Sequence, residues 1–156
     1  IFEDVIAPDF KNAIRSSLVA MTQNIPLTII KSNLQTRLER STGRQLTEIK
    51  TQISEYGRSI TATAAAAADL DLYLYTGPND GITRPFCKRL INLVVDESQM
   101  NKLNNGQGKS VKTSCGGYNC RHSWSPITES FVEAADLKRA TMSDINDANS
   151  DARKKR

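Results

Sequence analysis

Two stretches decide the fold: Tyr75-Thr-Gly-Pro-Asn-Asp-Gly-Ile-Thr-Arg-Pro-Phe-Cys87 and, further along the chain, Cys115-Gly-Gly-Tyr-Asn-Cys-Arg-His-Ser-Trp124. All three cysteines, the single histidine and the single tryptophan lie between Cys87 and Trp124. The Gly, Asn and Pro residues around them favour tight turns. We therefore expect this region to fold into one compact, cross-braced unit.

The cysteines and the histidine form a candidate metal site. Cys87, Cys115, Cys120 and His122 offer three thiolates and one imidazole, which tetrahedral zinc accepts. On an extended backbone Cys120 and His122 would point to one side and Arg121 to the other, while Cys115 could return across a Gly-Gly turn. The spacing differs from that of common zinc knuckles, so two hypotheses stand: a structural zinc, or free buried thiols packed with Trp124. In neither case do we expect a disulfide, because the chain shows no export signal.

The same stretches carry an ordered series of motifs. It consists of Asp80, Thr83-Arg84, Cys87, Asn119-Cys120-Arg121-His122 and Trp124-Ser-Pro126. This series resembles the signature of the phage Mu F-like minor head proteins, the head morphogenesis family of tailed bacteriophages, over residues 75–127. It departs from the commoner family ending, because Gly117-Tyr118 stand in place of His-Pro and His122 in place of the last Cys.

The resemblance implies a structural virion component and not an enzyme. Such a protein is made in the cytoplasm of the bacterial host and becomes part of the virion head, in multiple copies within a large assembly. Its implied partners are portal protein and capsid subunits, with contact to packaged DNA as a further option. Its implied role is in head assembly, head-tail connection or genome packaging.

Two other functions remain as alternatives. Similar domains also occur fused to toxin or effector modules, and an enzyme of this kind would use Cys120, His122 and Asp80. A DNA-binding protein would instead act through Arg153, Lys154, Lys155 and Arg156, whose four positive charges equal the net charge of +4 of the whole chain. The rest of the chain is therefore balanced in charge.

Composition and pattern predict an α+β protein. Its regions would be residues 1–69, a helical arm or hairpin; residues 70–128, the small Cys-rich α+β module; and residues 129–156, a C-terminal helix with a polar basic tail. The chain is 38% hydrophobic and 24% charged, which is ordinary for a soluble protein. No apolar run reaches the ~20 residues that span a bilayer, so we expect no membrane role.

The first region is predicted to be helical. Apolar residues recur at helical spacing over residues 10–21 and 27–38, and again at Leu46, Ile49, Ile53, Tyr56 and Ile60. Residues 64–68 are all alanine and extend the last helix. Gly43 joins two antiparallel helices or lies within one long helix. The apolar stripe is either covered by the chain's own core or by another chain.

Shorter elements follow in the module. We predict a strand over residues 70–75, a short helix with Cys87 on its inner face leading to a strand near Val94, and a helical turn over residues 96–100. A turn is expected at residues 104–108, a strand at 110–113 and a helix at 130–142, with a polar, mobile segment beyond Ser143. Asp80 and Arg84 could form an ion pair that pins the loop between them.

Overall fold

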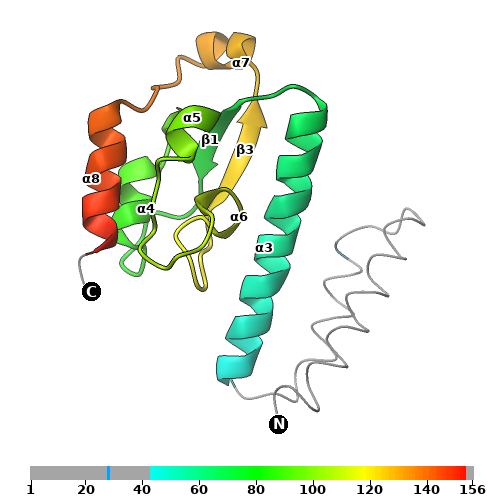
Figure 1. The fold of residues 1–156 in the computed structure, drawn as a ribbon, viewed down its shortest axis with the longest axis vertical. Coiled ribbons are helices and arrows are strands. Elements are labelled where there is room, and N and C mark those ends of the chain that lie inside the picture. The colour runs from blue at the N-terminus through cyan, green and yellow to red at the C-terminus, as the bar shows by residue number, and fades with distance from the viewer. Residues whose placement is uncertain (1–27, 29–42, 154–156) are drawn as a thin grey trace. The chain divides into compact units, whose positions relative to one another are not determined.

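The computed structural model describes residues 28 and 43–153 and confirms the α+β class with a C-terminal helix (Figure 1). The helices expected before residue 43, and the hairpin that would join them to the next helix, lie outside the described residues. Residues 47–156 belong to one compact unit. The elements are α3 (Gly43–Ala67), β1 (Leu72–Thr76), α4 (Pro85–Leu90), β2 (Val94–Asp96), α5 (Glu97–Met100), α6 (Val111–Ser114), β3 (Ser123–Ile127), α7 (Glu129–Ala134) and α8 (Met142–Ala152).

A three-stranded antiparallel sheet of order β2-β1-β3 forms the centre of the module. The alternating sequence of β1 places Tyr73 and Tyr75 in the larger hydrophobic core, while Leu72 packs in a smaller cluster on the other face. The expected strand is confirmed. Its last residues pair with β3 so that Tyr75 lies opposite Trp124. The two stretches that the sequence singles out are thus joined directly through the sheet.

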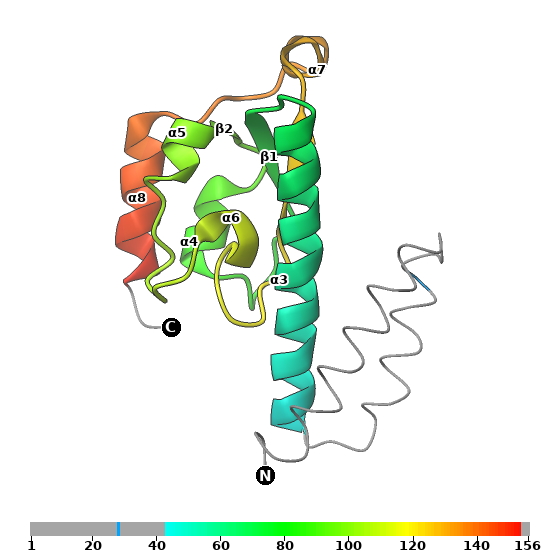
Figure 2. The ribbon, with the colours of Figure 1, turned by 45° about the vertical axis from the view of Figure 1, so that its right-hand side comes forward.

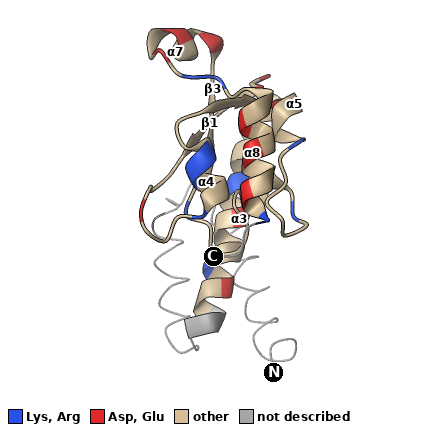
Figure 3. Cartoon of the chain, turned by 90° about the vertical axis from the view of Figure 1, so that its left-hand side faces the viewer, with Lys and Arg blue, Asp and Glu red and all other residues tan. Residues whose placement is uncertain are grey.

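Helices flank this sheet on two sides. In both views α3 runs alongside it, whereas α4 and α8 lie together on the side opposite α3 (Figures 1 and 2). The larger core takes Ala65 from α3, Phe86 and Leu90 from α4, and Ile145 and Ala148 from α8. The acidic face of α8 lies next to the basic end of α4 (Figure 3), where Arg89 forms an ion pair with Asp151 at 3.2 Å.

The helix α3 agrees with its sequence pattern from Gly43 to the alanine run. Ala65 is buried in the core, and its carbonyl accepts a bond from the Leu70 amide as the chain turns into β1. Ile60, on the predicted apolar stripe, remains 40% exposed. No helix in the described part of the chain combines the length and the apolar character needed to cross a membrane.

The strand expected at residues 110–113 is wrong, because this segment forms the short helix α6. The Ser110 carbonyl accepts bonds from both the amide and the hydroxyl of Ser114, which closes a helical turn. That turn buries Val111 and Ser114 together and aims the Val111 carbonyl at the indole of Trp124. The preference of the sequence for a strand is thus overridden by tertiary contacts.

The helix expected over residues 130–142 is also wrong in extent. It ends after Ala134, and Asp136 adopts a left-handed backbone with φ of 48°. The chain then runs extended, because the amide of Val94 bonds the carbonyl of Lys138 and the amide of Ala140 bonds the carbonyl of Val94. These two bonds to Val94 hold residues 138–140 in an extended conformation, which a continued helix would not allow.

The segment expected to be polar and mobile beyond Ser143 is instead the helix α8. Thr141 and Asp144 form a reciprocal capping box at its start. Ile145 and Ala148 are fully buried in the larger core, where α8 packs against α4. Because the sequence of α8 is mostly polar, its pattern does not predict this contact.

Replacing Ile145 with Ala should therefore lower the free energy of unfolding by about 2–4 kcal/mol, because it leaves a cavity under α8. Ile60→Ala is the matched control, since this side chain is 40% exposed and its loss should cost less than about 1 kcal/mol. Urea unfolding followed by circular dichroism measures both. Equal losses for the two variants would contradict the placement of α8.

Candidate metal centre

Cys87, Cys120 and His122 come together in the interior of the module. One ligand atom from each lies within 4.8 Å of the others, and all three residues are buried. The Sγ atoms of Cys87 and Cys120 are 3.8 Å apart, and Nδ1 of His122 lies 3.6 Å from Cys120 Sγ. Cys87 comes from α4, on its inner face as expected, while Cys120 and His122 come from the loop that enters β3.

The hydrogen bonds of His122 determine which ring nitrogen faces the sulfurs as an acceptor. Nε2 lies 2.9 Å from the carbonyl oxygen of Pro78. A carbonyl only accepts, so Nε2 carries a proton and Nδ1 is left to accept the Cys120 proton or to bind a metal. A ring whose second nitrogen donates to a backbone carbonyl is the usual support of a metal-binding histidine.

Tyr75 lies beneath the cluster and is fully buried. Its ring stacks on His122 with centroids 5.3 Å apart, and it packs at a tilt against Trp124 at 4.4 Å. Its hydroxyl donates to Cys87 Sγ at 3.4 Å. Burial, together with the nearby cysteines, raises the pKa of Tyr75 well above its usual value, so it stays a neutral donor.

Two glycines leave the space that the cluster needs. A Cβ at Gly116 would collide with Cys87 Sγ and press on Cys120 Sγ, and the Gly116 amide donates to Cys120 Sγ at 3.2 Å. A Cβ at Gly77 would collide with the ring of His122, and the φ of 152° at this residue also favours glycine. Both close approaches exclude any larger residue without rearrangement.

The two thiols of the cluster differ in acidity. The hydrogen bond with Cys87 and the bond donated by the Gly116 amide lower the pKa of Cys120 against the opposing effect of burial. The hydrogen bond to Cys120, together with burial, raises the pKa of Cys87. These contacts favour a thiolate at Cys120, and the thiolate is the form of a cysteine that binds metals.

Cys115, the fourth predicted ligand, is not part of this cluster. It is completely buried, and burial raises the pKa of its thiol to about 12. Its carbonyl accepts a bond from the side chain of Asn105. The structure thus brings together three of the four predicted ligands, and all three cysteines are free thiols.

Arg58 of α3 holds the backbone on which two of these ligands lie. Its guanidinium donates to the carbonyls of Cys120 at 2.6 Å, His122 at 3.0 Å and Thr113 at 3.3 Å. A planar group with several donors in fixed directions suits such a task. Arg58 therefore fixes both the loop and the position of α3 on the module.

The ion pair expected between Asp80 and Arg84 is wrong. Asp80 instead pairs with Arg121 through both carboxylate oxygens, at 2.7 and 2.8 Å, and accepts a bond from the Thr83 hydroxyl at 2.9 Å. Arg121 and Thr83 hold the pKa of Asp80 well below its usual value. Arg84 precedes α4 with an extended backbone, and its side chain donates to the carbonyl of Tyr118.

The other predicted motif residues brace the same loop. The Asn119 amide donates to the Thr51 hydroxyl of α3 at 3.0 Å, and Asn119 has a left-handed φ of 54°. Trp124 is buried, and its indole N–H donates to the Val111 carbonyl. Arg121 is exposed and pairs with Asp80, whereas Cys120 and His122 on either side of it are buried, as expected for an extended backbone.

Of the three residues named for the enzymatic alternative, Cys120 and His122 lie in contact at 3.6 Å, whereas Asp80 bonds other residues. Its carboxylate bonds Arg121 and Thr83, whereas the second ring nitrogen of His122 bonds the Pro78 carbonyl. Only one of the four basic residues at the end of the chain belongs to the described residues. Arg153 caps α8 and is exposed, while Lys154, Lys155 and Arg156 lie outside the described residues.

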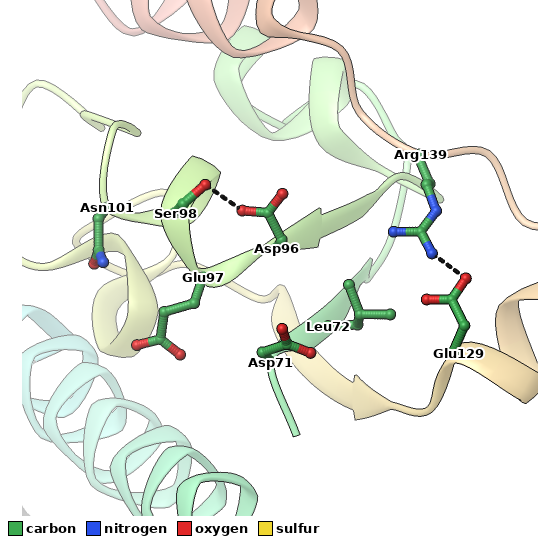
Figure 4. Close-up of a pocket in the computed structure, with 8 residues that line it drawn as sticks. All are labelled: Asp71, Leu72, Asp96, Glu97, Ser98, Asn101, Glu129 and Arg139. Carbon is green, nitrogen blue, oxygen red and sulfur yellow. Dashed lines mark hydrogen bonds and ion pairs between the residues drawn. The ribbon is translucent and has the colours of Figure 1, made fainter. Parts of the chain in front are cut away.

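A pocket of about 640 Å³ lies elsewhere, between β1, α5 and the start of α7 (Figure 4). Its lining includes Asp71, Asp96, Glu97 and Glu129, with Arg139 paired to Glu129. Asp96 turns toward Ser98, whose helix it caps. None of the cysteines or motif residues contributes to this pocket.

Sequence reasoning missed three important residues: Arg58, Tyr75 as the support of the cluster, and Thr51. Arg58 and Thr51 are polar positions on an amphipathic helix, where a solvent-facing role is the ordinary expectation. Tyr75 follows the strand pattern, which gives no sign of its hydroxyl contact. The one signal in the sequence is Gly116-Gly117, because glycine allows another backbone or a sulfur atom to approach closely.

Comparisons with known proteins add no relative: no protein-family model matches the chain, and neither the curated proteins nor the solved structures gave a match.

Arg58→Met should destabilise the module by about 2–4 kcal/mol, because charge-assisted hydrogen bonds to three carbonyls are lost while the side-chain length is kept. Arg139→Met is the control; this arginine pairs with Glu129 at the surface and its loss should have a much smaller effect. Chemical unfolding compares the two. An unchanged midpoint for Arg58→Met would show that the loop does not depend on this contact.

Proposed function

We propose that this chain is a structural component of a tailed-phage head, a minor head protein that joins portal or capsid subunits. The observation that carries the proposal is that the two halves of the Mu F-like signature meet in space. Asp80 pairs with Arg121, and Cys87 contacts Cys120, although each pair is far apart in the sequence. A chance series of motifs would have no reason to converge on one place.

The contacts of these residues favour a structural role over catalysis. The Thr83 hydroxyl donates to the Pro78 carbonyl and accepts from the Asp80 amide, which closes the turn. The indole N–H of Trp124 donates to the Val111 carbonyl. The pocket of Figure 4 is lined by other residues. The signature therefore serves to hold a rigid module, which is what a docking unit in a large assembly requires.

The helix α3 supplies the proposed route to the partners. Its contacts through Arg58 and Ala65 make it a fixed extension of the module. Ile60 stays partly exposed on the apolar stripe, together with the small exposed residues near the alanine run. In a head, subunits of the portal or capsid would cover this surface, which would order many copies of the module around the assembly.

We further propose that Cys87, Cys120 and His122 bind a structural zinc ion. Two thiolates and one imidazole suit zinc better than calcium or magnesium, which prefer oxygen ligands. The Pro78 carbonyl orients His122, while the Gly116 amide and the Tyr75 hydroxyl donate to the sulfurs. The metal would tie α4 to the loop before β3 and so stiffen the module.

Purified without chelator, the chain should hold about one zinc ion per molecule, and removal of the metal should lower its melting temperature. Cys120→Ser and His122→Ala should each lose the zinc, whereas Cys115→Ser should keep it because Cys115 lies outside the cluster. Elemental analysis of folded variants measures the content. Equal zinc retention by all variants, or a wild-type chain without zinc, would contradict the site.

The assembly role predicts where the chain is found. Particles released by the source bacterium should contain it in purified heads, and deletion of its gene should leave heads that are absent, empty or without tails. Immunoblotting and electron microscopy measure these outcomes. Normal heads from the deletion strain, with the protein found only as a free monomer in the lysate, would contradict the proposal.

A further inference from the structure

We propose that Cys87 and Cys120 are an oxidation site, which a hydroperoxide converts to a disulfide between these two sulfurs. The disulfide itself does not depend on the proposed function. Its consequence for metal binding and for a phage head does rest on that function.

The distance between the two sulfurs carries the proposal. The Sγ atoms lie 3.8 Å apart with each thiol in contact with the other. A disulfide needs about 2.05 Å, so closure requires a movement of a little under 2 Å. Gly116 lies beside both sulfurs and has no side chain to block them. The loop that carries Cys120 also contains Gly117, which can absorb small changes in the backbone.

The surroundings select this pair and this order of reaction. Cys120 is 7% exposed, whereas Cys87 is 1% exposed and Cys115 has no exposed surface. Because Cys120 is the most exposed of the three residues, the proposal has the oxidant react with Cys120 first. The Gly116 amide donates to this sulfur at 3.2 Å, and Cys87 Sγ lies 3.8 Å from it. Cys115 lies outside the cluster and is not the partner.

The chemistry balances in two steps. The sulfur of Cys120 attacks the peroxide oxygen, the O–O bond breaks, and a sulfenic acid forms with release of one water molecule. The sulfur of Cys87 then attacks Cys120 Sγ. The S–S bond forms, hydroxide leaves, and the thiol proton of Cys87 converts it to a second water. The two thiols lose two electrons in all, and hydrogen peroxide gains them.

Oxidation and metal binding exclude each other at this site, because the disulfide removes two of the three ligands and leaves His122 alone. A dithiol reductant would restore both thiols. Under the proposed function this coupling has a place in the life of a virion, since the protein is made in a reducing cytosol and reaches oxidising surroundings when the host lyses.

The test treats the metal-free full-length chain with hydrogen peroxide and analyses it by intact mass and non-reducing peptide mapping. The wild-type chain and Cys115→Ser should each lose two hydrogen atoms and yield a peptide linked through Cys87 and Cys120. Dithiothreitol should reverse the change. Cys87→Ser should instead stop at a sulfenic acid that dimedone labels. A linkage to Cys115, or sulfenic acid without any disulfide in the wild-type chain, would overturn the proposal.

A second arm separates the oxidation site from the zinc site. Preloading the chain with zinc should slow disulfide formation at least tenfold, and peroxide should then release the metal to a chromogenic chelator. If the disulfide forms but zinc neither binds nor protects, the oxidation site stands and the zinc proposal fails. If zinc binds but peroxide forms no disulfide in the metal-free chain, the oxidation site fails and the zinc site stands.

Discussion

The structure depends on one contact, the three hydrogen bonds that Arg58 of α3 donates to carbonyls of α6 and of the loop before β3. Two of the three carbonyls belong to Cys120 and His122, so this contact sets the position of both side chains. A short loop rich in glycine has many conformations in the unfolded chain, and a charged, planar donor group selects one of them. The same contact attaches α3 to the module. Support for the cluster and the attachment of the helix are therefore one feature.

Tyr75 supports the cluster of Cys87, Cys120 and His122 through contacts with two of its members. It belongs to β1, pairs with Trp124 of β3, stacks on His122 and donates to Cys87. Strand pairing, aromatic packing and the sulfur cluster thus share one fully buried side chain. Local propensity, packing and hydrogen bonding agree at this point, which is the condition for a single well-defined native arrangement. A rigid module of this kind suits a protein whose proposed task is to hold other subunits in place.

Much of this fold could be predicted from periodicity, because β1, α3 and α4 have clear patterns and strong formers. The convergence of Cys87, Cys120 and His122 was also accessible, since the spacing of the last two puts them on one side. The predictions that failed depend on contacts between residues far apart in the sequence. The strand expected around Val111 became α6, whose Val111 carbonyl meets Trp124, and α8 was missed because its apolar burial rests on Ile145 and Ala148. Partners of arginine and aspartate cannot be read from spacing, and Arg121 took the place expected for Arg84.

We propose that the loop held by Arg58 presents the Cys120 sulfur and the His122 imidazole to a metal that the Cys87 sulfur of α4 also binds. X-ray absorption at the zinc edge of the zinc-loaded chain tests it most directly. The account predicts two sulfur scatterers at about 2.3 Å and nitrogen or oxygen scatterers, including an imidazole, at about 2.0 Å. Three or more sulfurs would mean that Cys115 joins the site, and a shell of oxygen and nitrogen alone would mean that the cysteines do not bind. Either result would contradict the account.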